Sequence, residues 1–207
     1  PFFTRTYQNE QISGTRGTVI QEGESLNSIG DSDISVRYGL LNTGGLALSA
    51  SLKFGLPVGN SSGGSDGSFQ TGDGEFNQLL QVDLGIPFAF DVVPGFVKTY
   101  IGFNNRTMDF SDELHFGAEA GLNFLGNKVW LIGRINMVES LQNGSLSAQT
   151  NQGSIFANNI EYTSVGGEIA YYLTERLGIS FTYGGALSGR IIYANPTYSG
   201  GIFLDIK

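Results

Sequence analysis

Ten ionisable residues stand singly on the polar side of stretches in which apolar and polar residues alternate. They are Asp33, Arg37, Lys53, Asp83, Lys98, His115, Glu119, Arg134, Glu168 and Asp205. Apart from the histidine, four are basic and five acidic, so they can neutralise one another in a confined space. Two interpretations stay open: an ion-pair network that fills a narrow interior, and a polar path whose four basic members meet anionic groups.

His115 is the only histidine, and Glu119 follows it on the same face of its stretch. With a nearby serine, such a histidine–carboxylate pair would resemble the site of a lipid hydrolase. The sequence places no serine beside the pair, and Ser111 falls in an expected loop. We therefore expect His115 to belong to the polar network and the protein not to be an enzyme.

Metal and cofactor sites are not expected. One histidine and no cysteine argue against a transition-metal site. The Gly-rich stretch 59–75 contains Asp66, Asp73 and Glu75, and carboxylates are the ligands that calcium prefers. Their spacing matches no known calcium loop, so we expect a solvated loop there.

The stretch 46–58 shows most clearly which elements position these residues. Its even-numbered residues from Leu46 to Leu56 are apolar, whereas Ser49, Ser51 and Lys53 occupy the other side. A period of two indicates a β-strand rather than a helix. A strand of about ten residues with one apolar face is typical of a membrane-spanning β-strand.

The same alternation predicts about ten strands. They cover residues 2–8, 31–40, 46–58, 76–88, 95–105, 113–125, 128–139, 159–172, 177–187 and 197–207. Connections alternate between short turns and longer loops, as in outer-membrane barrels with short periplasmic turns. The sequence therefore predicts one all-β domain over residues 1–207, an antiparallel up-and-down transmembrane β-barrel with both ends on the short-turn side.

Composition favours a membrane barrel over a soluble one, which stays the rival fold. Charged residues make up 14% of the chain, against roughly a quarter in soluble domains. No run of about eighteen apolar residues is present, so a closed barrel is the spanning structure left. The net charge of −8, without a basic stripe, argues against nucleic-acid binding.

We expect the apolar face to point outward and the charged face to line the interior. A soluble barrel would bury its apolar face and carry far more lysine and glutamate outside. Aromatic residues near many strand ends suit the two membrane interfaces. They are Tyr38, Phe88, Phe103, Phe124, Tyr162, Tyr171, Tyr183 and Tyr198.

Three short motifs resemble a known family: Leu-Pro-Val-Gly at 56–59, Thr-Gly-Asp-Gly-Glu-Phe-Asn at 71–77, and Gly-Phe-Asn at 102–104. The chain resembles the meta-pathway phenol-degradation family of bacterial outer-membrane, transporter-like barrels. The resemblance implies a preceding signal peptide and early strands, hence about twelve strands in the full-length protein. Ile206 and Lys207 depart from the terminal aromatic usual in such barrels. The family pattern defines no catalytic residues.

These observations lead to a functional expectation. We expect a porin-like barrel of the Gram-negative outer membrane, with periplasmic termini, that passes or binds a small hydrophobic molecule. The alternative is an anchor subunit of a larger envelope assembly with a plugged interior. Expected partners are outer-membrane lipids, lipopolysaccharide and envelope proteins that contact the loops 9–30, 59–75 and 140–158.

Overall fold

A computed structural model gives the structure of the protein, and it describes residues 2–7, 10–11, 19–65, 67, 69–147, 156–192 and 195–206. Within these ranges every regular element is a β-strand. No helix in this part of the chain has the length and hydropathy needed to cross a membrane.

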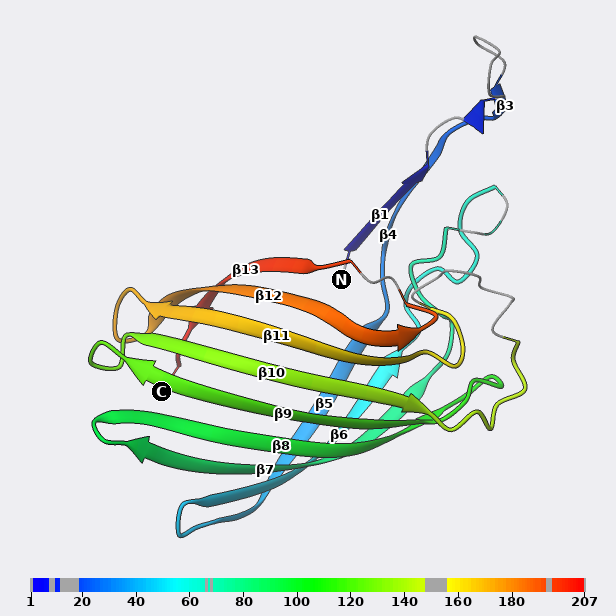
Figure 1. Cartoon of the computed structure of the whole chain (residues 1–207). Coiled ribbons are helices and arrows are strands. Elements are labelled where there is room, and N and C mark those ends of the chain that lie inside the picture. Colours follow the sequence, from blue (N-terminus) through cyan, green and yellow to red (C-terminus); the bar gives the residue numbers. More distant parts are fainter. Residues whose placement is uncertain are drawn as a thin grey trace.

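Nine strands form one antiparallel sheet in which each strand pairs with its neighbours in sequence (Figure 1). In chain order they are β5 (Ser32–Thr43), β6 (Leu46–Leu56), β7 (Asn77–Phe90), β8 (Val93–Arg106), β9 (Glu113–Phe124), β10 (Val129–Ser140), β11 (Glu161–Tyr172), β12 (Leu177–Arg190) and β13 (Thr197–Leu204). Tight turns join them at one end and longer connections at the other. The up-and-down order predicted from the alternation is therefore confirmed.

The sheet is strongly curved but not closed, so the predicted closed barrel is not formed by these strands. β5 and β13 are its two edges. Because all nine strands alternate in direction, β5 and β13 run the same way. They therefore cannot pair antiparallel with each other, and an antiparallel closure needs an odd number of further strands between them.

The segment 9–30 was expected to be a loop, and this expectation is wrong for its described residues. The short strands β2 (Glu10–Gln11) and β3 (Val19–Gln21) pair with each other. β4 (Glu24–Ile29) leads into β5 and pairs with β1 (Phe2–Tyr7). Both ends of the chain were expected at the tight-turn side of the sheet. Leu204 lies on that side, opposite Leu177, whereas Phe2 lies opposite Ile29 at the loop end.

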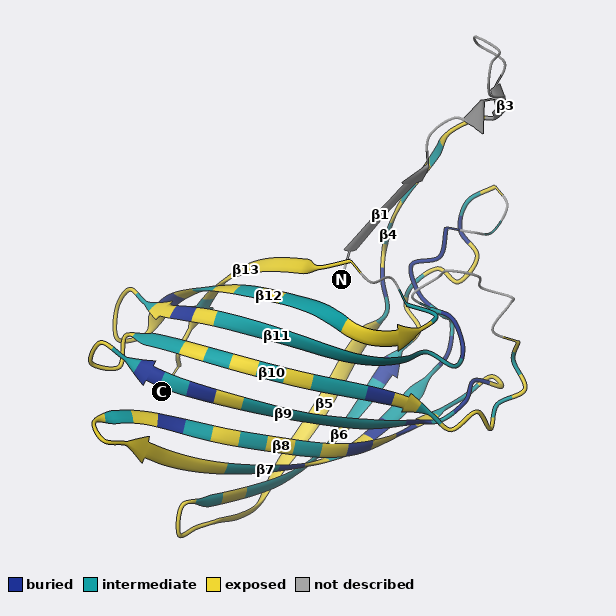
Figure 2. Cartoon of the chain, viewed as in Figure 1, coloured by how far each residue is buried: buried dark blue, intermediate teal, exposed yellow. Residues whose placement is uncertain are grey.

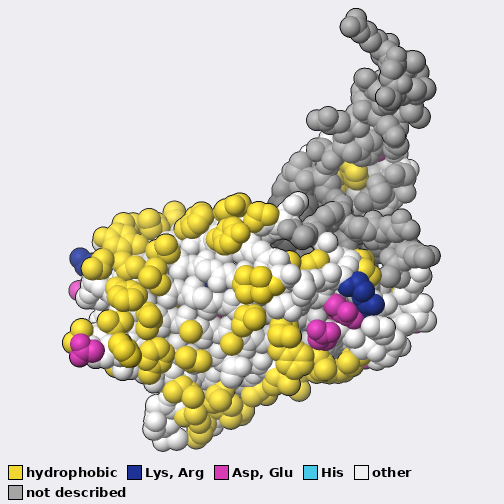
Figure 3. Space-filling view, viewed as in Figure 1, with side chains coloured by type: hydrophobic (Ala, Val, Ile, Leu, Met, Phe, Trp, Pro, Cys, Tyr) yellow, Lys and Arg dark blue, Asp and Glu magenta, His cyan; other side chains and the backbone are white. Residues whose placement is uncertain are grey.

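The two faces of the sheet differ in chemistry. Large apolar side chains are exposed on the convex face, with Ile34, Ile101 and Ile169 at 57%, 54% and 53% exposure. Figure 2 shows exposed positions recurring along all the strands of the sheet, and Figure 3 shows charged side chains mainly at the two ends of the strands on this face. The concave face carries the ion pairs described below.

Glycines on the concave face leave room for aromatic rings from the neighbouring strand. Tyr100 lies directly opposite Gly117, and a Cβ on that glycine would come within 2.2 Å of the ring. The ring crosses β9, and its hydroxyl donates to Asn136 Oδ1 on β10 at 2.9 Å. Phe96 likewise covers Gly121 and contacts Trp130, with ring centroids 5.5 Å apart. These rings fill part of the interior.

Candidate functional site

Arg134 is the centre of one ion-pair group on the concave face. Its guanidinium lies 2.5 Å from the carboxylates of both Glu119 and Glu168. The strand register explains this arrangement, because Arg134 lies opposite Glu119 on β9 and opposite Gly166 on β11. With no side chain at Gly166, Arg134 can reach Glu168 two residues further along β11.

Asp83 on β7 is the centre of a second ion-pair group on the concave face. Lys98 Nζ lies 3.2 Å from Asp83 Oδ1, and Arg37 lies 3.9 Å from Oδ2. Asp83 is only 4% exposed, so its charge depends on these partners. Asp33 forms a looser pair with Lys53 at 3.4 Å.

The fold thus joins eight of the ten residues singled out in the sequence into ion pairs with one another. Asp205 takes part in no ion pair within the described ranges, and its amide donates to the carbonyl of Arg176 at 2.8 Å. His115 has a different partner from the one expected. Its Nε2 lies 2.9 Å from Glu113, whereas Glu119 binds Arg134.

Ser111, the serine considered in the sequence analysis, has other partners in the structure. Ser111 is fully buried in the β8–β9 connection, where its hydroxyl accepts from the Gly144 amide at 3.0 Å. Its own amide donates to Asn158 Oδ1 at 2.9 Å. Ser111 therefore ties two loops together.

Arg106 at the loop end of β8 pairs with more carboxylates than any other cation in the described part of the chain, and the sequence analysis missed it. Its guanidinium contacts Glu75 at 2.6 Å, Glu113 at 2.7 Å and Asp73 at 3.2 Å. The ring of Phe110 lies 4.3 Å from its Cζ. Arg106 is 6% exposed and Glu75 side-chain exposure is 0%, so this Arg106 cluster is buried.

The stretch 59–75 was expected to be a solvated loop, but Thr71 and Glu75 within it are buried, and Glu75 belongs to the Arg106 cluster. Asp73 and Glu75 bind a guanidinium instead of offering free oxygens, and Asp66 lies outside the described residues. In the part of the chain that the structure describes, no group of three or more histidines or carboxylates is placed to hold a metal ion. A signal for Arg106 was present, since it continues the polar side of β8 just before the loop that leads to Glu113.

Asp31 holds the connection between β6 and β7 over the loop end of the sheet. Its carboxylate accepts from the amides of Gly59 and Asp73, both at 2.9 Å. Side chains at Gly59 and Gly72 would collide with Asp31, because an added Cβ would lie within 2.9 Å of its oxygens. The glycines of this stretch therefore allow the loop to fold around one carboxylate.

A cavity of about 490 Å³ lies beside the Arg106 cluster at the loop end of the concave face. His115, Val138 and Tyr162 form one row across β9, β10 and β11 in its floor. Ile191, Ile192 and Pro196 of the β12–β13 connection line it as well, together with Asn104. Tyr162 was expected on the outward apolar face, at one of the two membrane interfaces. The register instead places it on the concave side, opposite Val138.

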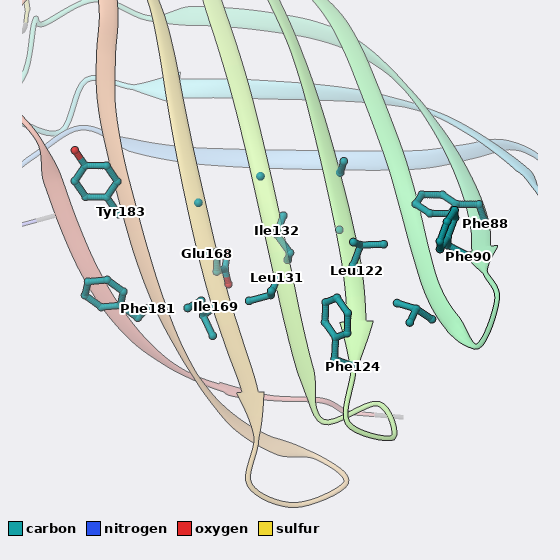
Figure 4. Close-up of a pocket in the computed structure, with 15 residues that line it drawn as sticks. Phe88, Phe90, Leu122, Phe124, Leu131, Ile132, Glu168, Ile169, Phe181 and Tyr183 are labelled. Atoms are coloured by element: carbon teal, nitrogen blue, oxygen red, sulfur yellow. The ribbon is translucent and has the colours of Figure 1, made fainter.

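A second hollow, of about 850 Å³, lies on the convex face near the tight turns. Ala120, Gly133 and Gly167 leave space between larger residues on neighbouring strands. Figure 4 shows the side chains around it, with Phe124, Leu131 and Ile169 on three neighbouring strands; they are among its lining residues. This convex groove is almost entirely apolar.

The raised pKa of the Asp73 carboxyl leads us to expect that the stability of the protein depends on pH. Burial raises the pKa of its carboxyl to about 6, although the hydrogen bond donated by the Glu75 amide acts in the opposite direction. Between the unfolded value of 3.8 and about 6, the folded protein binds a proton that the unfolded chain does not. Stability should therefore increase as pH falls through about 6, by on the order of 1 kcal/mol from this residue.

Urea unfolding at about pH 8 and about pH 5 measures this effect in wild type and in Asp73→Asn. The asparagine cannot titrate, so the part of the pH difference due to Asp73 should disappear in the variant. An unchanged difference would show that other groups cause it.

The chain matches no protein-family model and no curated protein. The resemblance to the meta-pathway family therefore rests on the three motifs alone.

Proposed function

We propose that the chain forms the wall of a β-barrel in a bacterial outer membrane, and that its concave face lines a path by which a small, largely apolar molecule passes or is held. The placement of the two residue classes carries this proposal. Exposed aliphatic and aromatic side chains cover the convex face, whereas paired charges occupy the concave face. A soluble sheet protein would bury its apolar face and expose its charges to water.

Closure of the barrel is part of the proposal. The edges β5 and β13 run in the same direction and need an odd number of further strands between them. Nine strands plus an odd number make an even total, as in bacterial outer-membrane barrels. The expectation of about twelve strands satisfies this condition.

The convex groove supports contact with lipid. Its lining offers almost no polar atoms, and its glycines leave a hollow between bulky residues. Acyl chains of outer-membrane lipids or lipopolysaccharide can fill such a hollow without losing hydrogen bonds. The same surface exposed to water would be an unusually large apolar patch.

The proposal of a path for a small molecule is supported by charged side chains on the concave face that remain partly exposed. Arg37 has a side-chain exposure of 57% and Lys98 of 33%, although both lie near Asp83. The cavity at the loop end adds space with both polar and apolar walls. An anchor protein with a plugged interior is the competing proposal, and the ion pairs around Arg134 favour it.

Conductance in planar bilayers separates these two proposals. We expect steady conductance from the reconstituted protein. Arg134→Ala should shift its reversal potential toward cation selectivity, because Glu119 and Glu168 lose their shared partner. The matched control is Arg176→Ala in an exposed tight turn, which should leave selectivity unchanged.

The outcomes point in different directions. A silent wild type with a conducting Arg134→Ala variant would support the plugged anchor. Silence in both proteins would overturn passage, and failure of the protein to associate with liposomes would overturn the membrane assignment.

A further inference from the structure

We infer that the open edge of β5 is a docking surface for one antiparallel strand, and that the segment of the full-length protein preceding Phe2 supplies this strand as a continuation of β1. This inference deepens the proposed function by naming the neighbour of β5 in the closed barrel. It rests on the proposed function only where a second copy of the chain is excluded as that neighbour.

β5 is a long edge strand without the usual protection. It has 12 residues, all of them exposed, and among the described residues only β6 pairs with it. Its apolar residues Ile34, Val36 and Tyr38 are more than half exposed. Edge strands that face water are usually short, or carry lysine or proline, and β5 contains neither residue. Its second side therefore presents backbone N–H and C=O groups that another strand can bind.

β1 lies on the side of β4 that continues this open edge. β4 leads into β5 through a link of two residues (Figure 1). The Ile29 carbonyl at the end of β4 accepts the Thr71 hydroxyl at 2.9 Å, so it points toward the connection between β6 and β7. Backbone groups of a strand point to its two sides in alternation, and β1 occupies the other side. That side is continuous with the unpaired side of β5.

The register of β1 and β4 directs the preceding chain along β5. The pair runs from Phe2, opposite Ile29, to Tyr7, so the N-terminal end of β1 lies beside the start of β5. Each earlier residue in this register lies opposite one residue further along β4 and β5. The sixth residue before Phe2 then faces Ser35. The resulting strand is antiparallel to β5 and also to β13, as closure of the barrel requires.

A second copy of this chain does not fit the edge. Antiparallel pairing of β5 with either edge strand of another copy would turn that copy upside down, because β5 and β13 run in the same direction. Its tight turns would then lie at the opposite face of the membrane. A strand continuous with β1 avoids this conflict. It also loses less chain entropy on docking, because β1 already holds its end beside β5.

Cysteine cross-linking in the full-length protein tests the inference. Residues 1–207 contain no cysteine, so introduced pairs meet no competing thiol in this part of the chain. Ser35→Cys is combined with a cysteine substitution at the sixth residue before Phe2, since facing residues of antiparallel strands lie within disulfide distance. The matched control uses the seventh residue, whose side chain points to the other face. We expect about fivefold or more intramolecular disulfide in the first pair relative to the control, measured by mass spectrometry of the digested protein.

Amide hydrogen exchange in the wild-type full-length protein is the second measurement, and it requires no substitution. Alternate amides of β5 point toward β6, and the others point toward the open edge. We expect the amides at the open edge to exchange about 100-fold or more slowly than unprotected amides, as the amides facing β6 do.

Fast exchange at the open edge, equal yields from the two cysteine pairs, or a mature N-terminus within a few residues of Phe2 would each overturn the inference. Slow exchange at this edge combined with disulfides between two different chains would also overturn it, because a partner's strand would then cover β5. These results are separable from the proposed function. Cross-linking without liposome association keeps the strand and overturns the membrane assignment, whereas liposome association without cross-linking keeps the membrane assignment and overturns the strand.

Discussion

Replacing Arg106 by alanine is expected to destabilise the protein by about 3 to 5 kcal/mol, the largest single effect that we predict. The guanidinium is the shared partner of Glu75, Glu113 and Asp73, and all three carboxylates lie at or below 15% side-chain exposure. Without it, buried negative charges repel one another and lose their hydrogen-bond donor. Urea unfolding in detergent micelles, followed by the fluorescence of the single tryptophan Trp130, measures the loss.

The matched control is Arg190→Ala. Arg190 also binds a carboxylate, Glu161, at 2.7 Å, but its side chain is 46% exposed. Its removal should cost at most about 1 kcal/mol, because water screens exposed pairs. Equal losses in the two variants would show that the Arg106 cluster does not hold the loop end together.

Gly117→Val is expected to give the second largest loss, about 1 to 3 kcal/mol. The Tyr100 ring lies where the new side chain must go, since even a Cβ would come within 2.2 Å of it. Displacement of the ring also breaks the hydrogen bond from the Tyr100 hydroxyl to Asn136. The same urea unfolding experiment measures the effect.

Gly133→Val is the control for this substitution. Gly133 lies on the adjacent strand β10, and nothing lies within 4 Å of a Cβ placed there. Its substitution should leave stability nearly unchanged. In a Tyr100→Ala background the penalty of Gly117→Val should also largely disappear, and a penalty that persists there would point to backbone strain instead of the ring.

Local patterning in the sequence was enough to predict the strands and their faces. All ten predicted strands are present within a few residues, because a period of two requires no knowledge of distant partners. Eight of the ten residues singled out by the same pattern lie within ion-pair distance of one another. The register was less predictable, since bulges near Gly39 and between Thr163 and Ser164 shift the pairing locally.

The partners in each ion pair could not be predicted from the spacing of the charged residues in the sequence. His115 was expected to pair with Glu119 because the two residues share a face. The register instead places Glu119 opposite Arg134 on the next strand, and these two form the ion pair. Arg106 ends β8, Glu113 begins β9, and Glu75 lies in the connection between β6 and β7. Only the folded connections bring the three together. The buried cluster is a product of tertiary structure.

The sequence by itself determined that this protein is an antiparallel up-and-down β-sheet with one apolar and one charged face, because alternation is a property of neighbouring residues. Only the tertiary structure decided that the described residues of segment 9–30 form the paired strands β2 and β3 and the strand β4, that the nine-stranded sheet stays open with edges running in the same direction, and that a cavity forms beside Asn104 and His115. These features depend on strand register, curvature and loop packing, which join residues far apart in the chain.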